Sequence, residues 1–417
     1  MEHVIIVGGG AAGMAAAISA AICGDRVTVL ERMDRVGKKI LATGNGRCNL
    51  MNTGEWRYPG GRMLAHAVLK RCGAKEQTHF WEYFGLRMRQ EEGSRVYPVS
   101  GAASTVLDTL RQAMAALQVE TVTDCSVTSL TRGKKGWVVK AGEAAYHADR
   151  VIVAGGGCAQ PKLGSDGSTW KLLTDCGHRF VKPRPALTQI ITETDAIRGL
   201  SGIRVRTDVA ITRGSKVQHR ESGELLFADY GVTGVCVMQC ARYAAPGDEI
   251  HIDLTKAMGF ESVDAFRQEL HRRRQLWQSP TYGTGQFCQR DLLTGLCVPK
   301  LGIALFRAAG IDHSHENVPD SIVRKNIEKL TLAAADLSLQ IKGVKGFESA
   351  QVTAGGIAAD EFDPSNMSSR LVPGLHAAGE VLDVDGDCGG YNLMFAFGSG
   401  ILAGLNGRKA PWEHDIR

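Results

Sequence analysis

The chain has 417 residues, more than one compact core usually holds, so two or three domains are expected. Its 44% hydrophobic and 22% charged residues are typical of a soluble globular protein. The net charge of +5 is compatible with an anionic small molecule and gives no support for a nucleic-acid partner. No apolar run reaches the roughly 20 residues of a membrane-spanning helix, and the eleven scattered cysteines, without a CxxC pair, indicate reduced thiols in a cytoplasmic protein.

The clearest motif lies in HVIIVGGGAAGMAAAISAAICGDRVTVLER, residues 3–32. A short apolar strand leads into GxGxxG and an alanine-rich helix, and a second strand ends at Glu31. The glycines let the backbone approach a pyrophosphate, which the helix N-terminus stabilises. Glu31 is placed to accept hydrogen bonds from ribose hydroxyls, and its charge disfavours a 2′-phosphate. This unit predicts a dinucleotide site that contains Gly8, Gly10, Ala11, Ala12, Gly13, Glu31 and Arg32.

The pattern then changes several times along the chain. Helical periodicity over 63–69, 76–84 and 104–117 is followed by two strands of a small antiparallel sheet, 125–132 and 136–142. A buried strand at 150–154 ends in glycines, and a loop and a helix follow it. From about Ala186 the strands alternate (187–192, 203–213, 224–234 and 248–254), as in a sheet or barrel domain. Helices are expected at 261–276, 291–309 and 321–330, and strands return at 335–343 and 349–357. The run Arg272-Arg273-Arg274 is interpreted as the solvated face of a helix.

Three strands end in glycines, at Val7, Ala154 and Ala378. They are expected to be neighbours in one parallel sheet, with their carboxyl ends on the side where ligands bind. Glu380 follows the last strand, and a helix that begins near Asn392 could face a negatively charged ring edge or phosphate. A dinucleotide bound by both ends of the chain must be long and extended, which favours FAD over NAD.

Six segments carry a more specific resemblance: VIIVGGGAAGMAAA, GKKILATGNGRCNLMN, RVYPVSGAASTVLDTL, VIVAGGG with PKLGSDG, GELLFADYGVTG and GLHAAGEVLDVDGDCGGYNLMFAFGSG. In this order the chain resembles, over essentially its whole length, the YhiN-like or BaiN-like NAD(P)/FAD-dependent oxidoreductases. Members of that family are described as dehydro-bile-acid reductases or aminoacetone oxidases. TGNGRCN and CGGYN are much more specific than GxGxxG.

The resemblance implies an α/β fold with a discontinuous Rossmann-like FAD-binding domain, residues 1–187 and 349–417. It further implies an inserted β-barrel-like domain, 188–254 and 333–348, and a small helical domain, 255–332. It assigns FAD contacts to the TGNGRCN region, where backbone N–H groups and basic side chains offset phosphate charge: Lys38, Ala42, Thr43, Gly44, Asn45, Arg47, Cys48 and Asn49. Further cofactor contacts are expected at Val127, Ala154, Gly155, Gly156, Gly379, Glu380, Asn392 and Leu393.

Three roles are considered for Cys48: packing or flavin contact, tuning of flavin reactivity, and thiol chemistry. The first is favoured. No resolving cysteine lies nearby in the sequence. Cysteine and histidine never appear at zinc spacing, so no metal is expected.

The sequence does not decide which side chains are catalytic. Relatives usually carry Thr-His where this chain has Ala228-Asp229, and Pro where it has Val235, so their substrate chemistry cannot be copied over. Asp229 is a candidate acid or base, and Tyr230 and Tyr391 are candidate proton donors to a substrate carbonyl. Each of the three is also compatible with a purely structural role.

We expect a flavoenzyme that takes a hydride from NADH or NADPH and reduces an activated C=C or carbonyl of a small, steroid-like substrate. An amine or aminoketone oxidase that uses oxygen is the alternative, because only one GxGxxG is present. A nucleic-acid-associated flavoprotein is a third reading, against which the weak net charge argues. Neither a monomer nor a homo-oligomer is favoured.

Overall fold

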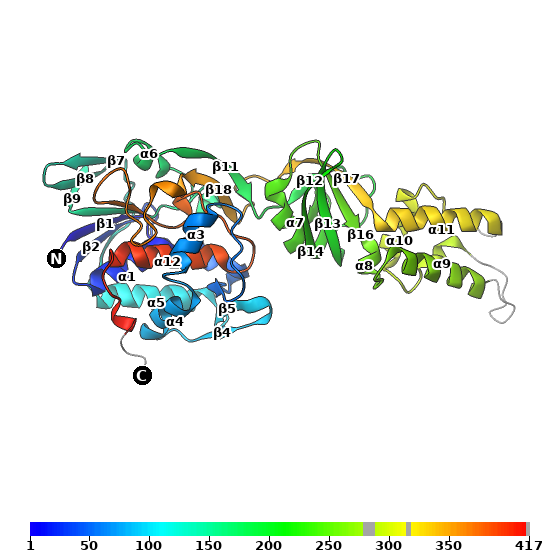
Figure 1. The fold of residues 1–417 in the computed structure, drawn as a ribbon, viewed down its shortest axis with the longest axis horizontal. Helices are drawn as coiled ribbons and strands as arrows, with labels where there is room; N and C mark the ends of the chain where they lie inside the picture. The colour runs from blue at the N-terminus through cyan, green and yellow to red at the C-terminus, as the bar shows by residue number, and fades with distance from the viewer. Residues whose placement is uncertain (278–287, 314–317, 414–417) are drawn as a thin grey trace. The chain divides into compact units, whose positions relative to one another are not determined.

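The computed structural model describes residues 1–277, 288–313 and 318–413. They divide into two compact units, Met1–Ala186 with Phe347–Arg417, and Leu187–Gly346 (Figure 1). The second unit contains both the barrel and the helices of residues 254–335, which precede the last barrel strand in the sequence. The finer division between a barrel and a helical domain remains a prediction.

A five-stranded parallel sheet forms the centre of the first unit, in the order β19-β10-β1-β2-β6. The three glycine-terminated strands expected to be neighbours are therefore adjacent, as β1, β10 and β19. The strand β6 was not marked by the sequence pattern. The strands are β1 (His3–Val7), β2 (Arg26–Leu30), β6 (Glu120–Val122), β10 (Arg150–Val153) and β19 (Leu375–Ala377).

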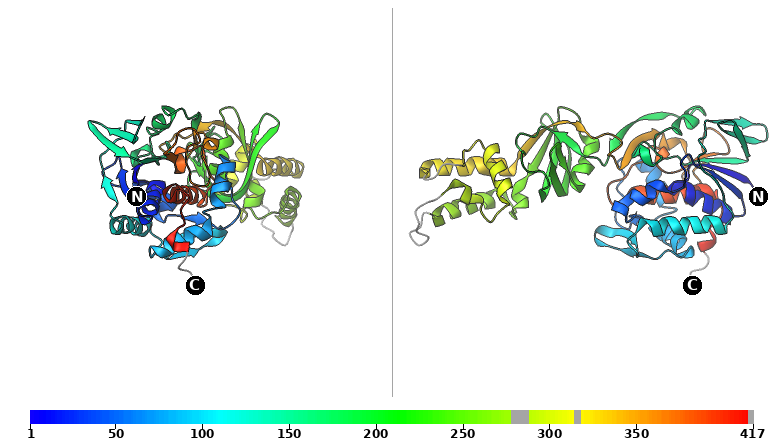
Figure 2. Two further views of the ribbon diagram at one scale, coloured as in Figure 1. Left: turned by 60° about the vertical axis from the view of Figure 1, so that its left-hand side comes forward. Right: turned by 180° about the vertical axis from the view of Figure 1, so that it is seen from behind.

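Helices α1 (Ala11–Ile22) and α12 (Tyr391–Leu405) come from opposite ends of the chain and lie side by side in every view (Figures 1 and 2). Small residues allow the close approach. A Cβ added at Gly400 would lie 2.3 Å from the carbonyl oxygen of Ala12, and one at Gly404 would lie 2.3 Å from that of Ala16. The C-terminal helix can therefore pack only because these positions carry no side chain.

The other elements of the first unit surround this centre. The helices are α2 (Lys38–Ala42), α3 (Arg62–Leu69), α4 (Ala74–Tyr83), α5 (Ala103–Ala116) and α6 (Trp170–Thr174). Two small antiparallel sheets join β3 (Met51–Asn52), β5 (Arg95–Pro98) and β4 (Met88–Gln90), and β7 (Ser129–Gly133), β8 (Gly136–Ala141) and β9 (Ala144–Ala148). Strands β11 (Phe180–Ala186) and β18 (Val352–Ile357) pair next to the points where the chain leaves and re-enters this unit.

The second unit contains a closed antiparallel barrel in the order β12-β15-β14-β13-β16-β17. Its strands are β12 (Ile190–Thr192), β13 (Arg204–Arg213), β14 (Lys216–Ala228), β15 (Gly231–Thr233), β16 (Glu249–Asp253) and β17 (Leu337–Val344). The helices of this unit are α7 (Val235–Cys240), α8 (Leu254–Ala257), α9 (Val263–Trp277), α10 (Pro299–Ala308) and α11 (Asp320–Ala335). Each of the six strands has two neighbours in this closed order.

Two expectations in this unit are corrected. The single helix expected at 291–309 is a 3-10 helix, Gln289–Leu293, and then α10, which begins at Pro299. Gly295 between them has a φ of +81°, which breaks a helix, and proline favours the first helical position. The segment 224–234 is not one strand, because Asp229 and Tyr230 turn the chain between β14 and β15.

Candidate functional site

A cavity opens at the carboxyl ends of β1, β10 and β19, where open parallel sheets bind ligands. It encloses about 1270 Å³, counting the part that is open to solvent. Of the expected cofactor contacts, these line it: Gly8, Gly10, Ala11, Ala12, Glu31, Arg32, Lys38, Thr43, Val127, Ala154, Gly155, Gly156, Gly379, Glu380, Asn392 and Leu393.

The glycine loop closes tightly on one side and is open on the other. Gly8 has a φ of +103°, and a Cβ there would lie 2.7 Å from the carbonyl oxygen of Ala154. A Cβ at Gly13 would lie 1.9 Å from the carbonyl oxygen of Gly8, so Gly13 seats the helix on the strand and does not line the cavity. A Cβ at Gly10 would meet nothing within 4 Å. The open face of Gly10 is where a pyrophosphate can approach the backbone.

Helices α1 and α12 both begin at the cavity without a side-chain cap, after Gly10 and Gly390 respectively. The first N–H groups of a helix have no partner within it, so both ends can bind an electronegative group. The Asn392 side chain is already committed, because its Oδ1 accepts from the Gly386 N–H at 2.8 Å and its Nδ2 donates to the Gly386 carbonyl at 2.9 Å. The backbone N–H groups of Asn392 and Leu393, which line the cavity, are therefore more available to a ligand than the Asn392 amide.

Glu31 is fixed at the end of β2 by two backbone N–H groups. Its carboxylate accepts from Gly9 at 2.7 Å and from Met33 at 2.8 Å. Next to it, Arg32 forms an ion pair with Asp166 and donates to the carbonyl of Gly164 at 3.0 Å. Because of these bonds, the loop after β10 is attached to the end of β2 and forms a wall at the expected ribose position.

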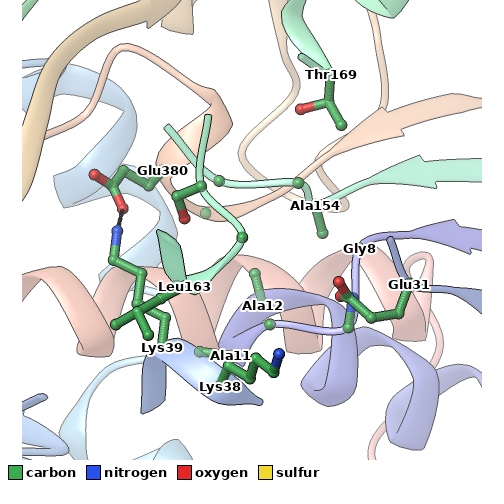
Figure 3. A pocket seen from close by; sticks show the side chains of 18 of the residues that line it. Gly8, Ala11, Ala12, Glu31, Lys38, Lys39, Ala154, Leu163, Thr169 and Glu380 are labelled. Atoms are coloured by element: carbon green, nitrogen blue, oxygen red, sulfur yellow. Dashed lines mark hydrogen bonds and ion pairs between the residues drawn. The ribbon is translucent and has the colours of Figure 1, made fainter. Parts of the chain in front are cut away.

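The far side of the cavity carries an ion pair. Lys39 Nζ lies 2.7 Å from Glu380 Oε2, and the other carboxylate oxygen accepts from the Thr353 N–H at 2.7 Å. In Figure 3 this pair and Glu31 lie on opposite sides of the pocket. The cavity is thus an extended slot with a carboxylate at one end, open backbone in the middle and an ion pair at the other.

Most of the TGNGRCN segment, and Ala42 before it, does not line this cavity. The expected contacts outside the lining are Ala42, Gly44, Asn45, Arg47, Cys48 and Asn49. Gly44, Asn45 and Cys48 have positive φ, and Arg47 stacks 4.2 Å from the ring centroid of Tyr97. A Cβ at Gly390 would lie 2.7 Å from Asn49 Oδ1. The segment therefore packs against the CGGYN turn from which α12 begins, and its direct contact with FAD remains a prediction.

The burial of Cys48 affects which of its three possible roles is favoured. Its side chain is fully buried, and burial raises the pKa of its thiol to about 12. The thiolate, which is the reactive form, is therefore absent at neutral pH. This environment favours packing over thiol chemistry.

Several cavity residues were not anticipated. Some adjoin predicted ones and could have been found by extending them, and others come from the loop after β10 or from β18, whose approach no local signal indicated. They include Gly9, Met33, Arg35, Gly37, Lys39, Ile40, Cys125, Ser126, Leu163, Gly164, Ser165, Ser168, Thr169, Gln351, Val352, Ala378, Val384, Phe395 and Ala396.

The three candidate catalytic groups do not line the cavity. Asp229 is exposed and Tyr230 half-buried in the β14–β15 turn, where Lys345 Nζ lies 3.7 Å from the ring centroid of Tyr230. Burial raises the pKa of Tyr230. Tyr391 belongs to the other unit, is buried, and accepts a hydrogen bond from the Tyr58 hydroxyl on its backbone carbonyl. All three assignments therefore remain predictions.

In residues 1–277, 288–313 and 318–413, no group of three or more His, Cys, Asp or Glu is arranged to hold a metal ion. Within the same ranges, no helix is long and apolar enough to cross a membrane.

Comparison with known proteins identifies the family. The model of the HI0933-like protein Rossmann domain matches residues 2–406. The chain belongs to this family. Its members are Rossmann-domain flavoprotein oxidoreductases, and this chain is accordingly a flavin-dependent oxidoreductase with an FAD-binding Rossmann fold. The slot, the Glu31 carboxylate at one end of it and the two uncapped helix N-termini fit that cofactor.

Among curated relatives, a 3-dehydro-bile acid delta(4,6)-reductase of Clostridium scindens is 36% identical over 99% of this chain and 100% of its own. A ribosomal RNA dihydrouridine synthase of Escherichia coli is 24% identical over 95% of each chain. Among solved structures, the 3-ketosteroid-delta4-(5alpha)-dehydrogenase of Rhodococcus jostii RHA1 has 16% identity and a TM-score of 0.48, covering 98% of this chain and 97% of that one.

Proposed function

We propose that this flavoprotein takes a hydride from NADH or NADPH and reduces a carbon–carbon double bond conjugated to a carbonyl group in a small, steroid-like substrate. The observation that carries the proposal is the 36% identity to a 3-dehydro-bile acid delta(4,6)-reductase, which extends over 99% of this chain.

The names of the relatives agree on a reaction class. A delta(4,6)-reductase of a 3-dehydro bile acid and a dihydrouridine synthase both saturate a C=C bond that is conjugated to a carbonyl. In such a reaction the β-carbon receives a hydride and the α-carbon a proton. When bound, FAD supplies the acceptance and release of the hydride. A reductase of this class needs a proton donor, and Tyr230 and Tyr391 stay the candidates for it.

The residues of the chain hold the cofactor in this scheme. Glu31 binds the adenosine ribose, and the Gly8–Gly10 loop with the N-terminus of α1 binds the pyrophosphate. Lys38 and Arg35, which line the cavity, offset phosphate charge. The N-terminus of α12 faces the cavity from the opposite end of the chain and stabilises electron density on the flavin ring edge.

An oxidase that transfers electrons from an amine or aminoketone to oxygen is the second candidate. The sequence has one GxGxxG motif, which the FAD cavity uses, and no second one for a nicotinamide dinucleotide. A nicotinamide donor must then bind transiently, without a Rossmann site of its own.

An anaerobic absorbance titration of the FAD-loaded protein with NADH and with NADPH separates the two candidates. Rapid bleaching of the flavin band by one nucleotide, and its return on addition of a 3-oxo-Δ4 steroid, is the expected result. If neither nucleotide bleaches the flavin band but an aminoketone bleaches it, the result contradicts the reductase and supports the oxidase. If a nucleotide bleaches the flavin and the enone does not reoxidise it, the proposed electron donor is supported and the proposed substrate class is rejected.

A further inference from the structure

Lys39 and Glu380 form an ion pair within the FAD cavity. Lys39 is the second residue of α2 and Glu380 follows β19, so the pair joins segments 341 residues apart. Nζ and Oε2 are 2.7 Å apart, and the side chains are 22% and 21% exposed. An ion pair this shielded interacts more strongly than one on the surface, where water screens the charges.

The Glu380 carboxylate is also held from the other side. Its Oε1 accepts from the Thr353 N–H of β18 at 2.7 Å, and a Cβ added at Gly157 would lie 3.1 Å from the same oxygen. The carboxylate therefore has a second anchor besides Lys39. Glu380 acts as a fixed support that holds the lysine ammonium inside the cavity.

The Lys39 ammonium has donors to spare. A lysine ammonium carries three N–H groups, and its bond to Glu380 is the only one found for Lys39 among the described residues. Since Lys39 lines the cavity, the other donors are available to the cofactor. Glu31 lies on the opposite side of the pocket in Figure 3. With the adenosine ribose at Glu31, as proposed above, Lys39 would face the ribityl and ring part of FAD.

We propose that Lys39 stabilises the negative charge that the flavin ring gains on reduction, and that Glu380 positions Lys39 and offsets part of its charge. Hydride transfer adds two electrons and one proton to the neutral oxidised ring, which leaves it with one negative charge. A nearby cation favours that form and raises the midpoint potential. The inference rests on FAD binding and not on the proposed enone substrate.

The midpoint potential of the FAD-loaded protein, measured at equilibrium against a reference dye, tests the proposal. Lys39→Met should reduce the preference for reduced over oxidised FAD by about tenfold, which lowers the potential by about 30 mV. Glu380→Gln keeps an oxygen that can accept from Lys39 and removes only the offsetting charge, so it should raise the potential. Lys39→Arg keeps the charge and should remain close to the unmodified protein.

Lys38→Met is the matched control, because Lys38 lines the same cavity but pairs with Asp34 outside the Lys39–Glu380 pair. It should change the potential less than Lys39→Met does. FAD affinity is measured for every variant by titration of the apoprotein. Weaker FAD binding by Lys39→Met with an unchanged potential overturns the proposal and leaves Lys39 a ribityl-binding residue.

If Lys39→Met does not retain FAD, the proposal is tested by two other variants. Glu380→Gln must still raise the midpoint potential, and Lys39→Arg must leave it close to that of the unmodified protein. Failure of either result overturns the proposal. None of these readings requires substrate turnover. A failed enone assay would therefore reject the proposed function without touching the role of Lys39.

Discussion

Cys48 shows how the surroundings of a residue decide its chemistry. It lies in the TGNGRCN segment, has a φ of +57° and is fully buried. Burial raises the pKa of its thiol to about 12, so the thiolate fraction is negligible across the pH range in which the protein would work. Its place in a specific motif therefore reflects the shape of the segment more than the reactivity of sulfur.

Cys48→Ser should keep FAD and its absorbance spectrum, with the rate of flavin reduction within about twofold of the original. The buried hydroxyl should lower stability by about 1 kcal/mol, the cost of an imperfectly paired polar group. Cys72→Ser, at another buried thiol, is the matched control. Flavin content and reduction rate are read from absorbance, and loss of reduction with FAD still bound would restore a thiol role for Cys48.

At the scale of elements, one buried arginine joins the sheet to the C-terminal helix. Arg150 begins β10, and its side chain is 3% exposed. Its guanidinium contacts the Asp25 carboxylate at 3.1 Å and donates to the carbonyl of Ala403 at 2.6 Å, near the end of α12. Arg408 donates to the same aspartate. This network lies at the amino ends of the strands, away from the cavity, so its contribution is to stability.

Asp25→Asn should lower the free energy of unfolding by on the order of 3 kcal/mol, because Arg150 is left buried with one anionic partner fewer. Although burial of Asp25 opposes ionisation, the hydrogen bonds and charges of Arg408, the Glu2 N–H and Arg150 hold its pKa below 3.8. A depressed carboxyl pKa stabilises the fold above the unfolded-state value and loses that contribution as pH falls through the folded-state value.

Urea unfolding at several pH values measures this effect. The deficit of Asp25→Asn should be full at pH 7 and should shrink below about pH 4, where Asp25 itself takes up a proton. Asp175→Asn is the control, because Asp175 pairs with Lys171 at the surface, where the two side chains are 48% and 74% exposed respectively. It should change stability by less than about 1 kcal/mol. Equal losses in the two variants would show that the buried network contributes no more than a surface pair.

The charge of the whole molecule affects whether its substrate could be a nucleic acid. The chain carries only +5, and each arginine of the run Arg272-Arg273-Arg274 has an acidic partner. Arg272 and Arg273 both bond to Glu269, and Arg274 pairs with Asp320 at 2.8 Å. Arg274 is also buried, which corrects the expectation that the whole run forms a solvated face. The charge of this run is therefore partly offset, which weakens its attraction for a phosphate backbone.

We expect no tight binding to ribosomal RNA at physiological salt, although relatives at 24% and 26% identity are ribosomal RNA dihydrouridine synthases. Binding of a ribosomal RNA fragment at increasing salt concentration measures this. A shallow salt dependence and weak affinity are the expected outcome. Tight binding that falls steeply with salt would move the substrate from a free enone to a uridine within RNA.

Much of the nucleotide-binding unit was predictable because its determinants are local. The strand–GxGxxG–helix–strand order and the acid at its end all lie within 30 residues, and the structure confirms the three glycine-terminated strands as neighbours. The helix expected at 291–309 was wrong, since Gly295 and Pro299 break a periodicity that apolar spacing alone does not register. The short strand β6 has too few residues to show any pattern.

The family, the cofactor class and the fold could be predicted from the sequence alone, because the motifs that indicate them are made of residues close together in the chain. Only the tertiary structure showed that Lys39 meets Glu380 across 341 residues, and that β18 supplies the Thr353 N–H that fixes the carboxylate. Only the structure, too, placed most of TGNGRCN behind the cavity wall. Such contacts arise when distant strands end at one edge of a sheet, and no local pattern of residues records which side chains will meet there.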